Sequence, residues 1–314
     1  MYSYRNLSLC LRFLCAVGLM IWVSRQLRFE EWQTFSWAQL DLYWLVAAFV
    51  FGGLSILGWA ARWWWFLRVY EIKVGFGDLL RLTFFADFFN LYFLGPLGAD
   101  GVRLLHLSQH FPSKRGAILG SLLMDHVSGL LGGVLLYCIF GRNGTLPINV
   151  VTAVDRLLPW LVIVTILGLG VIMEPPIQRL ISRIRGLAKI STWISPLYAG
   201  TFRHPWLFSG FVVSVLSTAC AYAAYWAAAR CVGAQLNLPF FLGIMPAVDF
   251  AASVPVSVSG LGIREGLLIH WLPLKNVDSL TLSLLGFAAI GLWGLIGGVW
   301  LLVWRRTARP LTPP

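Results

Sequence analysis

The chain has 314 residues, of which 58% are hydrophobic and only 12% are charged, and its formal net charge at pH 7 is +11. Soluble domains carry about 25% charged residues, so this composition excludes an ordinary soluble protein and indicates that lipid covers much of the surface. Lys and Arg accumulate in the cytoplasmic loops of membrane proteins, which accounts for the positive charge, and we therefore expect no nucleic-acid partner.

Six stretches are predicted to cross the membrane, because each offers close to the roughly 20 predominantly apolar residues that a spanning helix needs. They are 7–24, 42–66, 117–140, 156–173, 205–230 and 279–304. The first resembles a signal peptide, but Arg12 interrupts it and no small-residue cleavage site follows, so we expect a retained helix. Tryptophans near span ends are interpreted as interfacial anchors, namely Trp63, Trp64, Trp65 and Trp304.

Two further apolar stretches, 76–103 and 239–272, are interrupted near their middles by Gly, Pro and charged residues. Irregular backbone at membrane depth is tolerated only where protein or a water-filled cavity surrounds it. We therefore expect each stretch to enter the membrane and return as a re-entrant hairpin of two short, broken helices. If one of them crossed instead, the number of spans would be odd and the two termini would lie on opposite sides.

Basic residues predict the orientation, because cytoplasmic loops carry the excess of Lys and Arg. This rule places 67–116, 174–204 and the C-terminus in the cytoplasm, together with the N-terminus. Residues 175–203 place apolar side chains at helical spacing opposite arginines, which predicts a basic amphipathic helix on the inner leaflet, or a simple topology anchor. We thus expect an all-α polytopic membrane protein, a single integral domain over 1–314, in a bacterial cytoplasmic (inner) membrane.

The two interrupted stretches also resemble each other. Gly101-Val102-Arg103 matches Gly262-Ile263-Arg264, and Asp87 and Asp249 precede these motifs at similar distances. Three predicted spans lie between the motifs, and because that number is odd, the second copy would be inverted relative to the first. Inverted repeats with broken helices are typical of secondary transporters, although a structural duplication without transport would leave the same pattern.

Downstream segments extend the match. Gly129–Val134 reads Gly-Leu-Leu-Gly-Gly-Val, and Gly294–Val299 reads Gly-Leu-Ile-Gly-Gly-Val. Paired glycines are common wherever membrane helices pack closely, so this match alone could be accidental. Taken together, the matches predict repeat halves of roughly 42–140 and 205–304.

Ionisable residues inside a membrane are energetically costly and are functional candidates by default. Arg103 and Arg264 are the predicted substrate-binding cations, because a guanidinium is always charged and donates to phosphate in a bidentate geometry. Small residues beside them would let backbone N–H groups approach the same anion, namely Gly98, Gly101, Ser257, Ser259, Gly260 and Gly262. If a short helix begins at each motif, its N-terminus would attract the anion further.

The other ionisable candidates would balance the arginine charges or take up protons. They are Asp87, Asp100, Asp125, His126, Asp249 and Glu265, with Arg62 near a span end. Structural readings stay open beside this one. Asp100 and Arg103 could simply bridge on one helix face, Asp125 could have a purely structural partner, and Arg62 could extend to the interface.

A metal site is not expected. His106 and His110 are spaced for one helix face, but no acidic third ligand follows them at helical spacing. No serine in the second motif has a histidine beside it that could act as a base. We therefore predict no catalytic residue, no metal and no other cofactor.

Four segments together resemble a known family, the transmembrane region of lysylphosphatidylglycerol synthases and the flippase-like membrane proteins related to it. The segments are Arg62-Trp63, Pro96 through Arg103, Asp125 through Gly129 and Pro255 through Glu265. Two positions depart from the family pattern, because His126 stands where an arginine is usual and Ala99 where a second glycine is common. Nothing follows residue 314, so we expect the soluble aminoacyl-transferase domain of the full synthases to be absent.

The resemblance implies lipid handling and not lysine transfer. We therefore expect a lipid flippase that is not an enzyme, with a membrane lipid of anionic or glycosylated headgroup as its substrate. Two alternatives remain at this point: an accessory membrane protein that presents lipid to a separate transferase, and an intramembrane lipid-modifying enzyme. A homodimer or a complex with a partner transferase would fit the resemblance.

Overall fold

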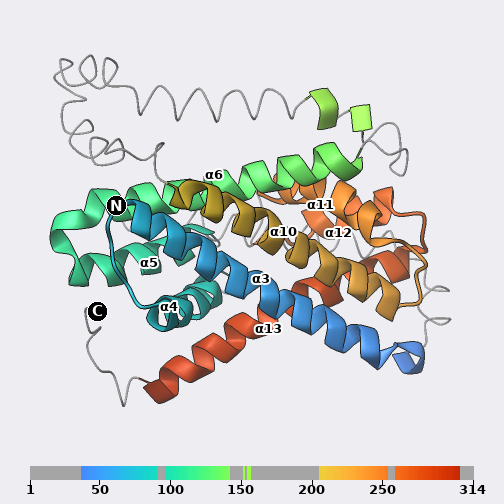
Figure 1. The fold of residues 1–314 in the computed structure, drawn as a ribbon. Coiled ribbons are helices and arrows are strands. Elements are labelled where there is room, and N and C mark those ends of the chain that lie inside the picture. Colours follow the sequence, from blue (N-terminus) through green and yellow to red (C-terminus); the bar gives the residue numbers. More distant parts are fainter. Residues whose placement is uncertain are drawn as a thin grey trace, which may run out of the picture.

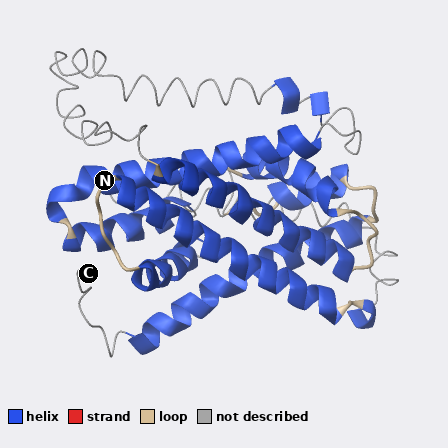
Figure 2. Ribbon diagram, in the orientation of Figure 1, coloured by secondary structure: helices blue, strands red, loops and turns tan. Residues whose placement is uncertain are grey.

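The computed structural model describes residues 37–90, 96–141, 151–152, 154–156, 205–253 and 259–304. The regular structure of these residues is helical throughout, without a strand (Figure 2). The protein is therefore an all-α polytopic membrane protein. Outside the described residues lie the predicted span 7–24, the predicted span 156–173 apart from residue 156, the amphipathic helix predicted at 175–203 and the candidate Ser257.

Four segments in the described part are long and apolar enough to cross a membrane, and they coincide with four of the six predicted spans. The helices are α3 (Leu42–Val69), α6 (Arg115–Leu136), α10 (Trp206–Cys231) and α13 (Asn276–Trp304). Short turns flank two of these helices. The turn η1 (Trp37–Gln39) precedes α3, η3 (Pro112–Lys114) precedes α6, and the π-helical turn η4 (Tyr137–Gly141) follows α6.

Each interrupted stretch forms two short helices, as its glycines, prolines and charges predict. The helices are α4 (Phe76–Phe89), α5 (Pro96–His110), α11 (Leu238–Ala252) and α12 (Ile263–Trp271). None reaches the roughly 20 residues that a spanning helix needs. The helices of each pair contact one another, and the two pairs lie toward opposite ends of the bundle (Figure 1).

The segment that contains α4 and α5 leaves one end of α3 and returns to that same end. The Lys114 ammonium, which follows α5, donates to the carbonyl oxygen of Glu71, which precedes α4, at 2.8 Å. A path that starts and finishes at one end of the bundle is what the re-entrant prediction for 76–103 requires.

The centre of the fold is the antiparallel pair of α3 and α10 (Figure 1). The N–H of Asp41, before α3, donates to the carbonyl oxygen of Cys231 at the end of α10, at 3.1 Å. Small residues bring the two backbones together along the way, since a Cβ on Gly58 would lie only 2.4 Å from the Cβ of Ser217. Small residues at helix interfaces are the usual means of close packing in membranes, where no hydrophobic effect drives the helices together.

The same local contacts recur at a spacing of 162 residues. Trp64 donates its indole N–H to the carbonyl of Val74 at 2.9 Å, and Trp226 donates to Leu236 at 3.0 Å. The residues with positive φ that follow α3 and α10 are also 162 apart, Glu71 and Gly233. These repeated contacts support the predicted duplication.

The contacts between helices also repeat, with each helix of one part replaced by its equivalent in the other. Helix α3 packs on α4, α6 and α13, whereas α10 packs on α11, α13 and α6. Helix α4 contacts α5 and α13, whereas α11 contacts α12 and α6. The described helices of one half therefore repeat the arrangement of the other.

Substituting Gly58 by leucine should destabilise the protein, because the side chain would be forced into α10. Overpacking of this kind typically lowers the free energy of unfolding by about 1–3 kcal/mol. The matched control is Gly77→Leu in α4, since a Cβ on Gly77 meets no atom of the described chain within 4 Å. Thermal unfolding of both variants in detergent checks this, and equal melting temperatures would contradict the packing described here.

Candidate functional site

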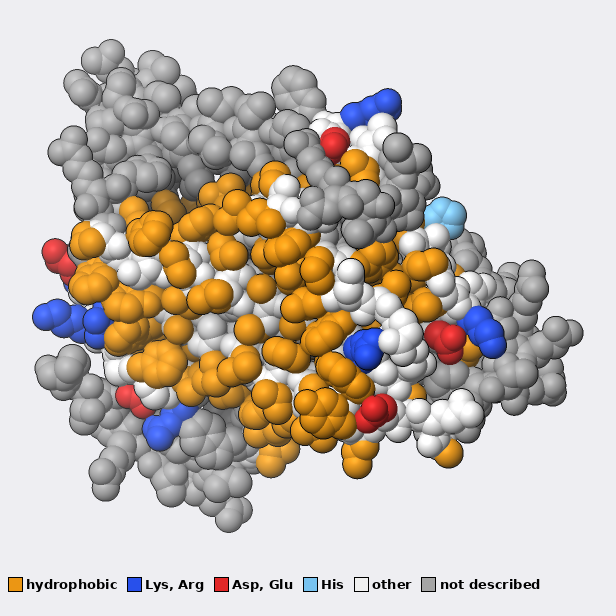
Figure 3. Space-filling model, turned by 45° about the vertical axis from the view of Figure 1, so that its right-hand side comes forward, with side chains coloured by type: hydrophobic (Ala, Val, Ile, Leu, Met, Phe, Trp, Pro, Cys, Tyr) orange, Lys and Arg blue, Asp and Glu red, His pale blue; other side chains and the backbone are white. Residues whose placement is uncertain are grey.

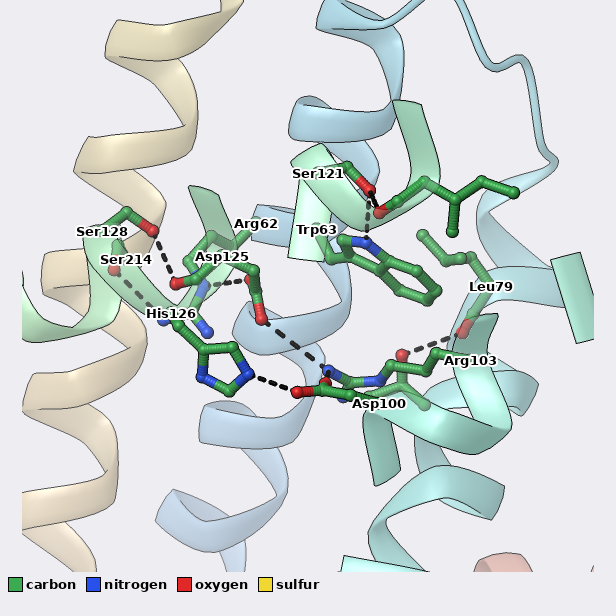
Figure 4. Close-up of polar contacts among 12 residues, drawn as sticks. Arg62, Trp63, Leu79, Asp100, Arg103, Ser121, Asp125, His126, Ser128 and Ser214 are labelled. Atoms are coloured by element: carbon green, nitrogen blue, oxygen red, sulfur yellow. Dashed lines mark hydrogen bonds and ion pairs between the residues drawn. The ribbon is translucent and has the colours of Figure 1, made fainter. Parts of the chain in front are cut away.

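A buried ion pair joins α3 to α6 inside the apolar bundle (Figure 4). Arg62 Nε donates to Asp125 Oδ1 at 2.5 Å, and the two side chains are only 9% and 3% exposed. Arg62 Nη1 also donates to the hydroxyl of Ser214 on α10, at 3.2 Å. Arg62 therefore does not extend to the interface, and that reading is wrong.

Gly129 makes room for this pair. A Cβ at Gly129 would lie 2.9 Å from Arg62 Nη1, so the guanidinium occupies the space that a side chain would fill. The glycine four residues after Asp125 thus has a local reason, because both face Arg62 on successive turns of α6.

Arg103 on α5 shares the same carboxylate. Its Nη1 lies 3.7 Å from Asp125 Oδ2 and 3.7 Å from Asp100 Oδ1, and its guanidinium stands 5.1 Å from the centre of the Trp63 ring. The bridge between Asp100 and Arg103 on one helix face is therefore present. Arg103 Nε has no hydrogen-bond partner among the described residues.

His126 closes the outer side of this cluster. Its Nε2 lies 2.5 Å from Asp100 Oδ2, and the imidazole side chain is 51% exposed whereas the carboxylate is 22% exposed. Asp87, at the end of α4, is buried and lies within the electrostatic field of Arg103. We call Arg62, Asp100, Arg103, Asp125 and His126 the first arginine centre.

A short helix does begin in the first motif, but the arginine of the motif lies far from its N-terminus. Helix α5 begins at Pro96, which places Arg103 about two turns inside the helix and away from its N-terminal N–H groups. Proline is favoured in a first helical turn because its missing N–H would have no partner there. Gly98 is buried in this helix, and a Cβ at Gly101 meets no atom of the described residues within 4 Å.

A second arginine lies between α11, α12, α10 and α13. Arg264 Nη2 is 4.0 Å from Asp249 Oδ1, and the guanidinium stands 5.8 Å from the Tyr225 ring centre and 5.4 Å from that of Phe287. Its Nε and Nη1 are buried without a hydrogen-bond partner among the described residues. Tyr222, also on α10, interacts electrostatically with Asp249. We call Tyr222, Tyr225, Asp249, Arg264 and Phe287 the second arginine centre.

The second motif does start a helix, and its N-terminus is already capped from within. Helix α12 begins at Ile263, and Glu265 Oε2 accepts from the Gly262 N–H at 2.6 Å. Glu265 Oε1 accepts from the Ser283 hydroxyl at 3.2 Å, and the side chain is fully buried. The carboxylate thus occupies the helix terminus that we expected an anionic substrate to use.

The turn before α12 depends on glycine and touches the first half of the chain. Gly260 and Gly262 have φ of +73° and +86°, where side chains other than hydrogen are strained. The Ser259 hydroxyl donates to the carbonyl oxygen of Asn90, at the end of α4, at 3.1 Å. The two interrupted stretches therefore meet.

Aromatic residues are the part of both centres that sequence reasoning missed. Trp63 was expected at the interface, yet it is fully buried and donates its indole N–H to Ser121 Oγ at 3.1 Å, so that expectation is wrong. Tyr222 and Tyr225 lie three residues apart in an apolar span, and this spacing of hydroxyl groups on one helix face was the available signal. Among the described residues, no three His, Cys, Asp or Glu side chains are placed to hold a metal.

Replacing Asp125 by alanine should lower the free energy of unfolding by about 3–5 kcal/mol, because two buried guanidiniums lose their shared partner. The double variant Arg62→Ala/Asp125→Ala should lose less than the sum of the single variants, since the pair shares one interaction. The control is Asp78→Ala in the exposed pair with Arg81, whose side chains are 28% and 43% exposed and which should contribute about 1 kcal/mol or less. Chemical unfolding in detergent measures all of these, and additive losses would contradict the coupling.

Comparison with known proteins places the chain in a family. No curated protein matches the sequence. A family described as lysylphosphatidylglycerol synthase TM region matches residues 9–298, which include both arginine centres and nearly all of the four described spans. Since the match covers most of the chain, the protein belongs to the lysylphosphatidylglycerol synthase transmembrane-region family.

Proposed function

We propose that this protein binds a lipid with an anionic or glycosylated headgroup and moves it across the bacterial cytoplasmic membrane. Its family is one of membrane proteins related to lipid headgroup modification or translocation. The observation that carries this proposal is the pair of arginine centres, each placed between long helices that could span a membrane and the short helices of an interrupted stretch.

The energetics favour a role in handling a polar group. A guanidinium near the bilayer centre is costly and is retained where it pairs or binds, so ionisable groups there usually mark a substrate or ion path. Both Arg103 and Arg264 keep donor atoms without a protein partner in the described residues, although each is largely buried. A phosphate oxygen is the acceptor that best satisfies such donors.

Charge at the two ends supports an orientation. One face is broadly apolar, and charged side chains lie toward its two ends (Figure 3). The end at which α3 finishes carries Arg68, Lys73, Arg81, Lys114 and Arg115 against Glu71 and Asp78. The end at which α3 begins carries Arg230 and Lys275 against Asp41 and Asp278. By the positive-inside rule, the first end is cytoplasmic.

The helix arrangement supports a transport path through the repeat. The short pairs lie toward opposite ends of the bundle, and the long central helices are antiparallel, as an inverted repeat requires (Figure 1). In such repeats, sites formed by broken helices near the midplane are exposed alternately to the two sides. Asp100 with His126, and Asp249 with Tyr222, are the partly exposed carboxylates that would exchange charge with the headgroup or with protons.

The experiment is transport in reconstituted vesicles. Purified full-length protein in vesicles of neutral lipid containing a trace of fluorescent phosphatidylglycerol should equalise the label between leaflets faster than empty vesicles. Arg264→Ala should reduce the rate on the order of tenfold or more, because one charge-assisted contact is lost. The control Arg81→Ala removes an exposed arginine and should transport like the unaltered protein.

The alternatives give different results in the same preparation. Movement no faster than in empty vesicles would overturn the flippase proposal. Binding of the labelled lipid without movement would point to an accessory protein that presents lipid, and a new species in the extracted lipids would point to an enzyme.

A further inference from the structure

The two arginine centres occupy equivalent places in the two halves. Residues that surround Arg103 and Arg264 are spaced by the same 162 positions as the repeated hydrogen bonds, and the arginines themselves by 161. The pairs are Trp63 and Tyr225, Asp87 and Asp249, and Asp125 and Phe287. In each half an aromatic ring of the first long helix faces the arginine, and a carboxylate of the first short helix interacts with it electrostatically.

The second long helix breaks the equivalence. Where α6 presents Asp125 to Arg103, α13 presents the ring of Phe287 to Arg264. An aromatic face attracts a guanidinium but brings no negative charge and no strong acceptor. Arg264 therefore has no counterpart of the carboxylate that neutralises Arg103.

The charged residues that support the first centre are also replaced by uncharged residues in the second. Arg62, which fixes Asp125, stands 162 positions before Ala224, and His126 stands 162 positions before Ala288. Asp100, which also pairs with Arg103, stands 161 positions before Leu261. The first centre is thus a closed network of opposite charges, and the second has none of these groups at the equivalent positions. The other carboxylate near Arg264 is Glu265, whose oxygens already accept from the Gly262 N–H and the Ser283 hydroxyl.

The acids that remain also differ in their freedom to move. Asp125 is 3% exposed and is held by Arg62 at 2.5 Å, so it cannot leave Arg103 without breaking a second buried pair. Asp249 is 45% exposed and lies 4.0 Å from Arg264, which is an ion pair but not a hydrogen bond. A ligand could displace Asp249 without leaving any other buried charge unpaired.

We propose that Arg264 alone is the exchangeable anion site, that Phe287 keeps it available, and that Arg103 is a positioning residue locked into the scaffold. This inference rests on the proposed function and narrows it, because the two arginines are no longer equal binding groups. The ligand is a phosphate group, carried by a lipid headgroup or free in solution. Two donor atoms of Arg264, Nε and Nη1, are without a partner in the described chain, and a phosphate oxygen is the kind of acceptor that would satisfy such donors.

The decisive variant is Phe287→Asp, which gives the second centre the carboxylate that the first one has. The probes are short-chain phosphatidylglycerol, inorganic phosphate and diacylglycerol, each titrated against the full-length protein in detergent and followed by native mass spectrometry. We expect the phosphatidylglycerol affinity to fall on the order of tenfold or more for Phe287→Asp, as for loss of one charge-assisted contact. The control Phe287→Asn introduces a side chain of the size of aspartate without its charge, and it should bind phosphatidylglycerol far better than Phe287→Asp.

Two further variants keep the test independent of the folding of Phe287→Asp. Arg103→Ala should lower the melting temperature yet bind phosphatidylglycerol, at a temperature where it is folded, within about threefold of the unaltered protein. Asp125→Asn removes the negative charge that neutralises Arg103. Arg103 should then bind an anion as well, so the number of bound phosphate groups should rise from one to two.

Equal affinities of Phe287→Asp and Phe287→Asn, or loss of binding in folded Arg103→Ala, would overturn the assignment. Diacylglycerol binding as tight as phosphatidylglycerol binding would also overturn the assignment. Binding of phosphatidylglycerol but not of inorganic phosphate identifies a phosphate group carried by a lipid. Binding of both identifies a site for phosphate itself. Failure of transport in vesicles with these binding results intact would refute the flippase proposal and leave the anion site standing.

Discussion

A single carboxylate organises the first half of this membrane protein. Asp125 pairs with Arg62 on α3 and with Arg103 on α5, and Arg62 extends the network to Ser214 on α10. Because a charge inside an apolar bundle is costly unless it is paired and hydrogen-bonded, each of these helices is fixed relative to α6 by groups that cannot be separated cheaply. The central packing of α3 on α10 and the position of the short helix α5 depend on this network.

The sequence was sufficient for the features that depend on local composition. The four described spans and the two interrupted stretches follow from runs of apolar residues and from the Gly, Pro and charged residues that break them. Buried charges were identifiable for a related reason, since Asp87, Arg103 and Asp125 stand out in an apolar chain. Each of them is buried in the fold.

What could not be predicted depends on pairing across the chain. Arg62 and Asp125 are 63 positions apart, and nothing local indicates that they meet. The burial of Trp63 could not be predicted for the same reason. An indole near a span end is interpreted as an interfacial anchor unless its hydrogen-bond partner, here Ser121, is known. Phe287 gave no signal at all, since a phenylalanine in an apolar span differs from its neighbours only through the arginine it faces.

The contact between Ser259 and Asn90 is one-sided. In it, the second half supplies a donor to a backbone carbonyl of the first half. The position 162 residues after Asn90 is Ala252, and the position 161 residues before Ser259 is Gly98, which has no hydroxyl to return the bond. The contact therefore runs in one direction only, because the second interrupted stretch donates and the first accepts. Its loss would separate the two stretches without removing a matching bond elsewhere.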